Sequence, residues 1–190
     1  MFNQLSSEKR ATLLPIARSY VAKRQDSKGY FGTPNNDWTS RLSGSYKIAA
    51  FLDGTGSPIP RKKDMRETTL HHLFNSDYRS TIVLYNTANM LNIVGRNGEN
   101  FDLDMRIQIV RRFTNLLKKM HGPDGGFVTQ IGKASPTQNG IRLADDVIES
   151  NTNATGLAHK ARNLIVQLAT GKEEPYPHAN SVEFLNALPQ

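Results

Sequence analysis

The chain has 190 residues, no cysteine, and 24 lysines and arginines against 17 acidic residues, which gives a formal net charge of +7. This length is typical of a single domain with a sizeable core, and the absence of cysteine excludes disulfides, cysteine-ligated metal centres and thiol nucleophiles. No apolar run approaches the roughly 18 residues that a membrane-spanning helix needs, and the first residues lack a signal-peptide core, so we expect a cytoplasmic protein without a membrane span.

Six helices are predicted from the spacing of apolar residues. In chain order, their apolar positions cover residues 13–21, 41–52, 63–75, 79–94, 103–120 and 154–168. Pro15 lacks an amide donor and crowds the preceding turn, so the first helix either begins near Leu13 or is kinked there. The fourth helix is apolar on almost every side, which is typical of a buried helix.

The fifth and sixth helices have the clearest patterns. The apolar stripe of the fifth helix is predicted on Leu103, Ile107, Val110, Phe113, Leu117 and Met120. Asp102 lies at its N-cap position, and Gly122-Pro123 ends it. Strand signals are scarce, and residues 128–149 form a long segment without a convincing period. We therefore expect an all-α domain over residues 1–172, followed by a proline-containing arm over residues 173–190.

Two Gly-aromatic segments indicate an internal repeat. Lys28-Gly29-Tyr30-Phe31-Gly32 and Asp124-Gly125-Gly126-Phe127 lie 96 residues apart, counted from Gly29 to Gly125. Each follows a basic helix and leads through a polar loop into another helix. Such periodicity predicts stacked antiparallel helical hairpins, which cannot bury their apolar faces singly.

Helix pairs joined by Gly-Gly-Phe turns resemble the units of the α/α-toroid superfamily, which includes terpenoid cyclases, protein prenyltransferases, and helical-toroid glycosidases and polysaccharide lyases. The resemblance covers about residues 10–170. It implies a partial toroid of three hairpins, about half of the usual ring, which a homodimer could complete. An open helical bundle is the alternative, and the Gly-Gly-Phe turn also has a plain structural explanation in a glycine with positive φ at a helix end.

Antiparallel hairpins place the loops 25–40, 76–79 and 121–150 at one end of the domain. The candidate catalytic residues on these loops are Asp37, Asp145, Asp146 and Glu149, and the candidate substrate-binding residues are Trp38, Arg41, Asp77, Tyr78 and Arg142. Carboxylates, amides and aromatic rings together favour recognition of a glycan. Paired carboxylates could cleave a glycosidic bond, and a tyrosine beside an arginine would suit β-elimination from a uronic acid.

Each candidate also has a structural interpretation. Asp77 could cap the fourth helix, and Glu149, Ser150 or Asn151 the sixth, while Trp38 could pack between hairpins. The spacing from Asp145 to Glu149 superficially resembles the aspartate-rich magnesium–diphosphate motif of isoprenoid enzymes. The histidines lack the spacing of a zinc site, so we expect neither a metal nor a cofactor.

Two functions therefore remain open. The first is a carbohydrate-related domain that binds or cleaves a glycan, and the positive charge would suit an acidic one. The second is a non-catalytic helical interaction module, or the remnant of a larger toroid enzyme. Nucleic acid is not an expected partner, because the basic clusters are scattered and lack interleaved aromatics. Asn86, Asn89 and Asn92 form a polar stripe on the fourth helix that either links hairpins or lines a cavity.

Overall fold

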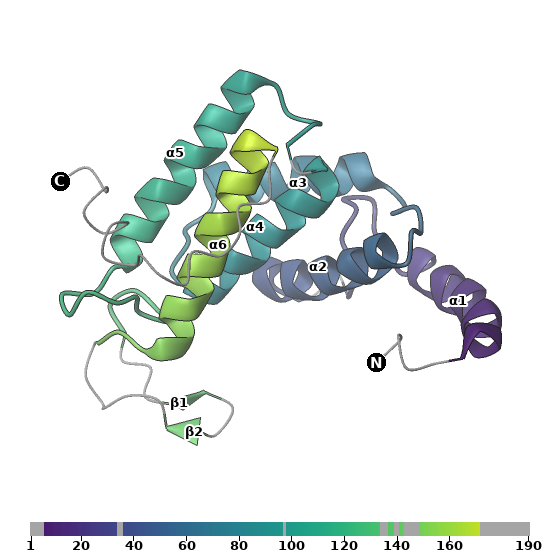
Figure 1. Cartoon of the computed structure of the whole chain (residues 1–190), viewed down its shortest axis with the longest axis horizontal. Helices are drawn as coiled ribbons and strands as arrows, with labels where there is room; N and C mark the ends of the chain where they lie inside the picture. Colours follow the sequence, from purple (N-terminus) through teal and green to yellow (C-terminus); the bar gives the residue numbers. More distant parts are fainter. Residues whose placement is uncertain are drawn as a thin grey trace.

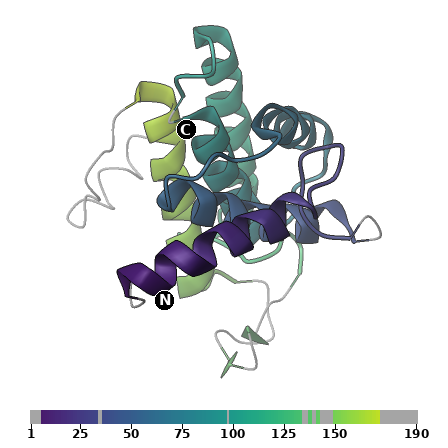
Figure 2. The ribbon, with the colours of Figure 1, turned by 90° about the vertical axis from the view of Figure 1, so that its right-hand side faces the viewer.

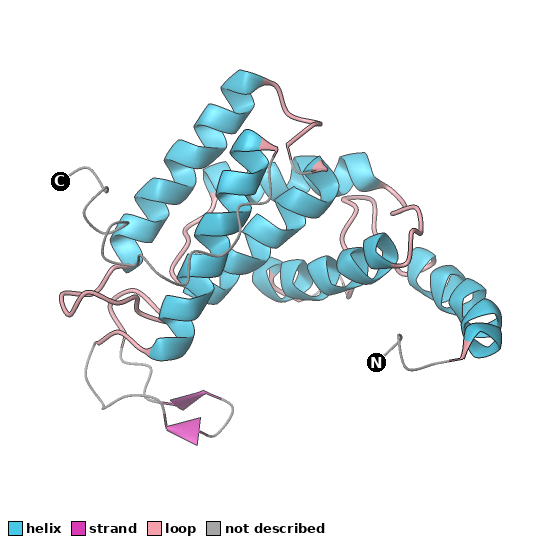
Figure 3. Ribbon diagram, in the orientation of Figure 1, coloured by secondary structure: helices cyan, strands magenta, loops and turns pink. Residues whose placement is uncertain are grey.

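The computed structural model describes residues 6–33, 36–96, 98–133, 137–138, 141–142 and 149–171, and within these residues the fold is all-α (Figure 1). The helices are α1 (Ser7–Ala22), α2 (Trp38–Gly54), α3 (Lys62–Asn75), α4 (Thr81–Gly95), α5 (Leu103–Met120) and α6 (Thr152–Thr170). Strands β1 (Thr137–Gln138) and β2 (Ile141–Arg142) form a short antiparallel ladder, shown in magenta in Figure 3. The predicted arm over residues 173–190 lies outside the described residues.

All six predicted helices are present, and the largest difference in their bounds is at α1. This helix begins at Ser7, ahead of the predicted start, and continues through Pro15. Ser6 caps it by accepting a hydrogen bond from the Lys9 amide, and Glu8 lies in its first turn, where a negative charge is favoured. These polar start signals lie N-terminal to the apolar positions that predict the helix.

The helices form two layers. Helix α4 packs most extensively against α6 and α2, so these three helices form an inner row, and α3 and α5 pack outside α4 and α6. Most of α4 is buried, as its sequence predicts. Asn92 links two members of the row, because its side-chain amide donates to the Leu164 carbonyl of α6 at 2.6 Å. Linking hairpins, one of the two predicted roles of the asparagine stripe, is thus confirmed for this residue.

The Gly-aromatic segments form equivalent turns. The amide of Asp26 donates to the Tyr30 carbonyl at 2.9 Å, and at the corresponding positions the amide of Gly122 donates to Gly126 at 2.8 Å. Gly29 and Gly125 have positive φ values of 81° and 88°, which glycine adopts without steric cost. The repeat seen in the sequence is therefore also a repeat of backbone hydrogen bonding.

The phenylalanine that ends each segment attaches the turn to the next helix. The Phe31 amide donates to the Ser45 hydroxyl of α2 at 2.8 Å, and the Phe127 amide donates to the Thr155 hydroxyl of α6 at 3.0 Å. Both aromatic side chains are buried. The two turns thus use the same device to fix a helix that follows them in the chain.

Helix α5 has the predicted bounds but presents a different face to the core. Its buried residues are Ile109, Phe113, Leu116 and Met120, whereas Leu103 and Ile107 of the predicted stripe are exposed. The N-terminal turns of α5 do pack on the core, but through Met105, which lies on the same side as Ile109 and Phe113; Leu103 and Ile107 lie on another side of the helix. The prediction is therefore wrong for its first two members.

Helix α1 projects from the rest of the structure. Figure 1 shows it at one end of the molecule, beyond α2, and in Figure 2 it crosses in front of the other helices. Its C-terminal half is held to the connection between α2 and α3, where the Arg18 guanidinium donates to the Ser57 hydroxyl at 2.6 Å. Val21 packs against the core cluster to which α2, α3, α4 and the first Gly-aromatic turn contribute. The hairpin of α1 and α2 is thus more open than the hairpins of α3–α4 and α5–α6.

Candidate functional site

The connections α1–α2, α3–α4 and α5–α6 meet at one end of the inner row, which we call the rim. Trp38, at the start of α2, lies edge-on to Tyr78 with ring centroids 5.3 Å apart. The Ile131 amide donates to the Arg79 carbonyl at 2.8 Å, and the Asn151 side-chain amide donates to the Thr129 hydroxyl at 2.6 Å. For the described residues, the predicted convergence of these three loops is confirmed.

Asp37 lies at the rim and serves as the N-cap of α2. Its carboxylate accepts hydrogen bonds from the amides of Thr39 at 2.9 Å and Ser40 at 3.1 Å, and from both of their hydroxyls. These hydrogen bonds, that of the Ser40 hydroxyl foremost, hold the pKa of Asp37 well below its usual range. A carboxylate held ionised in this way is a poor general acid, so the geometry favours an anchoring role for Asp37.

Trp38 is the centre of an aromatic cluster. Its ring stacks on His72 of α3 with centroids 4.6 Å apart and an interplanar angle of 12°, and Tyr30 lies 6.1 Å from His72. Burial is the first cause that lowers the pKa of His72, followed by the positive charges of neighbouring groups. His72 is therefore a neutral stacking partner near neutral pH. Sequence reasoning missed it, because no local pattern marks a residue that stacks on a distant ring.

Arg41 forms an ion pair with Asp26 of the first Gly-aromatic turn. The pair is largely shielded, with 14% of the Arg41 side chain and 22% of the Asp26 side chain exposed. Asp26 also accepts hydrogen bonds from the Lys28 and Tyr30 amides at 2.9 Å. Arg41 therefore neutralises the acid that organises this turn, a structural task that differs from its predicted contact with a substrate.

Asp77 and Tyr78 are neighbours in the chain but lie in different environments. Asp77 is exposed and pairs with Arg79, with 2.6 Å between the Arg79 Nε and a carboxylate oxygen. The N-cap of α4 is Ser80, so the predicted capping by Asp77 is wrong. Tyr78 is 2% exposed, and its hydroxyl lies 3.0 Å from that of Thr87. Burial raises the pKa of Tyr78, and its phenol is a neutral core group.

The third connection is fixed by its own hydrogen bonds. Ser150 donates from its amide and hydroxyl to the Asp124 carboxylate at 3.1 and 2.5 Å, and Asn151 caps α6 by accepting from the Ala154 amide at 2.8 Å. Glu149 lies directly before Ser150 in the chain. Of the three predicted capping candidates, Asn151 is the one that caps. Asp145 and Asp146 lie outside the described residues, and Arg142 is described only by its backbone position in β2.

The described residues offer a second candidate surface on α1. Leu13, Ile16 and Tyr20 lie on one face of this helix and are 44%, 62% and 56% exposed. An open depression on the same side is lined by Pro15, Ile16, Ser19, Tyr20, Lys23 and Arg24. The Arg24 guanidinium stacks 3.5 Å from the centre of the Tyr20 ring. This face, which we call the α1 face, is apolar with basic residues at its C-terminal end.

Neither a metal-binding cluster nor a membrane-spanning helix is found in the part of the chain that the structure describes. There, no group of three or more histidine, aspartate or glutamate residues is placed to hold a metal ion. Nor does any described helix have the length and apolar character needed to cross a membrane.

Comparison with known proteins gives no further guidance: no family model matches this chain, and searches of curated proteins and of solved structures yield no similar protein.

Proposed function

We propose that this chain is a helical interaction module that binds a protein partner through the α1 face. The observation that carries the proposal is the exposure of Leu13, Ile16 and Tyr20 on α1, a helix that packs extensively against none of the other described helices. Large apolar side chains gathered on one exposed face mark interaction surfaces more often than isolated ones do. Tyrosine and arginine side chains, both present here, are enriched among the residues that contribute most to binding.

The chemistry of the α1 face indicates what kind of partner fits. A binding segment would bring apolar side chains to Leu13 and Ile16, and carboxylates to Lys23 and Arg24. Because α1 is a helix of 16 residues with few contacts to the core, a docked partner would also stabilise it. An amphipathic acidic helix is the simplest segment that provides both groups.

Site-specific photo-crosslinking tests this function. We expect a benzoyl-phenylalanine side chain introduced at Tyr20 to form a crosslinked protein product in expressing cells. The product should disappear when Ile16→Glu is added, because a buried carboxylate opposes apolar docking. A probe at Lys47, an exposed position on α2, is the matched control. Equal yields from Tyr20 and Lys47, or a yield unaffected by Ile16→Glu, would contradict the proposal.

A second candidate function is glycan binding at the rim. It is favoured by Trp38, a half-buried ring with one face stacked on His72, next to the exposed carboxylates of Asp37 and Asp77. Rings and carboxylates in this arrangement suit the faces and hydroxyls of a sugar. The proposal concerns binding, since the Asp37 carboxylate is already occupied by four donors.

A thermal-shift screen with neutral and uronic-acid oligosaccharides tests this second function. A ligand at 100 times its Kd should stabilise the fold by about 2.7 kcal/mol. Trp38→Phe should weaken the response, and Tyr46→Phe, on a different part of α2, should leave it unchanged. No stabilisation by any of the sugars would remove this candidate and leave the interaction module.

A further inference from the structure

A second exposed apolar surface lies at the N-terminal end of α5. Leu103 and Ile107 are 69% and 38% exposed, and their spacing of four residues places them on the same side of the helix. Val110, one turn further, is half-buried. Asp102 and Asp104 are exposed at this end, and Arg111 is exposed further along. We call this surface the α5 face.

The two faces have matching spacings when the helices run antiparallel. Read from its C-terminal end, the α1 face presents Tyr20, Ile16 and Leu13, at intervals of four and three residues. Read from its N-terminal end, the α5 face presents Leu103, Ile107 and Val110, at the same intervals. Antiparallel docking therefore sets Tyr20 beside Leu103 and Ile16 beside Ile107.

The charges are complementary at one end of the pairing in the same orientation. The basic end of α1, with Lys23 and Arg24, comes to the end of α5 that carries Asp102 and Asp104. Further along, the same register sets Arg111 opposite Thr12, and α5 is basic there, so the complementarity is confined to the end with Asp102 and Asp104. Antiparallel helix dipoles also favour this orientation.

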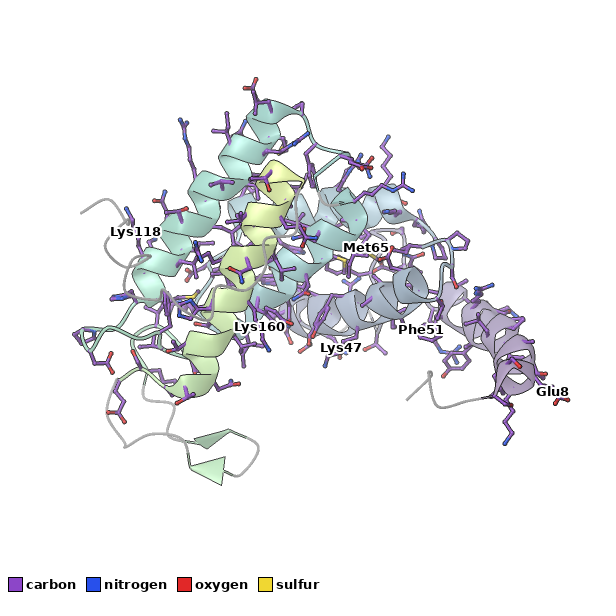
Figure 4. The ribbon with its side chains drawn as sticks, in the orientation of Figure 1. Glu8, Lys47, Phe51, Met65, Lys118 and Lys160 are labelled. Atoms are coloured by element: carbon purple, nitrogen blue, oxygen red, sulfur yellow. The ribbon has the colours of Figure 1, made fainter. Side chains whose placement is uncertain are left out.

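The two faces cannot meet within one copy of the chain. In Figure 1, α1 lies at the right of the molecule and α5 at the left, with α2 between them in this view; Figure 4 labels Glu8 on α1 and Lys118 at the C-terminal end of α5, the end away from Leu103. Each copy nevertheless carries both faces. A two-fold pairing places α1 of each copy on α5 of the other, so both exposed surfaces are covered by one symmetric arrangement.

We propose that the partner of the α1 face is a second copy of this chain, with α1 docked antiparallel on the α5 face. This inference rests on the proposed function of the α1 face. The two copies would then join end to end. The α5 face of each copy would supply the packing partner that α1 of the other copy lacks. The fit between the spacings, the charges and the positions of the two helices supports this pairing over an unrelated partner.

Charge reversal with analytical ultracentrifugation of the full-length protein tests the pairing. We expect wild type to form a dimer whose population rises with concentration and falls with salt. Lys23→Glu and Asp104→Lys should each raise the dimer Kd about tenfold or more, and the double variant should recover most of the loss. Lys47→Glu and Glu67→Lys, reversals at exposed positions on α2 and α3, are the controls. Circular dichroism checks that every variant folds.

The location of the contact is tested with the crosslinker at Tyr20 in purified protein. The expected product is a dimer in which Tyr20 is joined to a peptide containing Leu103 or Ile107. A monomer at all concentrations, failure of the double variant to recover, or a dimer crosslinked elsewhere would overturn the pairing. If purified protein is monomeric but the Ile16-dependent product still forms in cells with another protein, the interaction module stands without self-association. If no product forms in either setting, both proposals fail.

Discussion

Trp38 and His72 stack nearly parallel, with ring centroids 4.6 Å apart, although they belong to different helices. Trp38 is the only tryptophan in the chain. Burial and nearby positive charge lower the pKa of His72, so protonation of His72 brings a charge directly against the indole ring. The pair therefore gives this fold an internal spectroscopic reporter at its rim.

We expect the tryptophan fluorescence of the folded protein to titrate with a midpoint below the ordinary histidine pKa of about 6.5. The physical reason is that the half-buried imidazole gains its proton only when the solution is more acidic. His72→Gln should abolish the transition, whereas His121→Gln should leave it in place. A midpoint at or above the ordinary value would contradict the burial of His72.

The free energy of unfolding should fall as the pH falls below about 6.5. Burial lowers the pKa of both His72 and His159 in the folded state, so the unfolded chain binds more protons in this range, and stability rises with pH. The contribution is fully present above the unfolded pKa and is lost on acidification. Urea unfolding across this interval measures the slope, which should be smaller in His72→Gln. An unchanged slope would show that His72 is not the titrating group.

The aromatic cluster shows where sequence reasoning reaches its limit. Antiparallel helices return the chain to the same end of the domain, which predicts that Trp38 and Tyr78 lie close together, and the structure brings them into contact. The alternation of helices does not indicate whether a side chain on a connecting loop faces outward or into the core. Tyr78, a predicted substrate-binding residue, is instead part of the core, and Thr87 on the following helix α4 provides a partner for its hydroxyl.

Gly29 and Gly125 provide a matched pair for testing the repeated turn. Both have positive φ, so alanine should be strained at either position by about 1 kcal/mol. A Cβ on Gly29 would lie 2.3 Å from the Met65 amide nitrogen, whereas nothing lies within 4 Å at Gly125. We expect Gly29→Ala to be far more destabilising than Gly125→Ala in urea unfolding. Equal effects would mean that the close packing of the first turn on α3 relaxes easily.

Two substitutions of Asp37 distinguish a role in capping α2 from a role in ligand binding. Asn caps helices about as well as Asp, so Asp37→Asn should keep the melting temperature close to that of wild type, whereas Asp37→Ala should lower it by a few degrees. If a glycan needs the carboxylate, its thermal shift should shrink in both variants. An Asp37→Asn protein that retains the full shift would assign Asp37 to structure alone.

The helix ends show which sequence signals were reliable. Asp102 was predicted as the N-cap of α5, and its carboxylate accepts from the Met105 amide at 2.7 Å. The local sequence is sufficient to predict this cap, because a capping side chain and the amide that it accepts from are close together in the chain. The exposure of Leu103 depends instead on which side of α5 the other helices cover, since Phe101 and Met105 beside it both contact the core. Asn139-Gly140 is a strong hairpin signal that could have indicated the short ladder of β1 and β2.

Asn92 tests the link between α4 and α6. Its side-chain amide donates to Leu164 of α6 at 2.6 Å, whereas that of Asn89 donates to Tyr85 of its own helix at 3.0 Å. Both changes to alanine gain helix propensity, so the difference between them isolates the interhelical contact. We expect Asn92→Ala to lose about 1–3 kcal/mol more than Asn89→Ala, because it removes a buried hydrogen bond and leaves space between two packed helices. The shift should appear in the urea midpoint without a change in slope. Similar midpoints for the two variants would show that apolar packing alone holds the inner row together, and Asn92 would then be an accommodated polar group with no linking role.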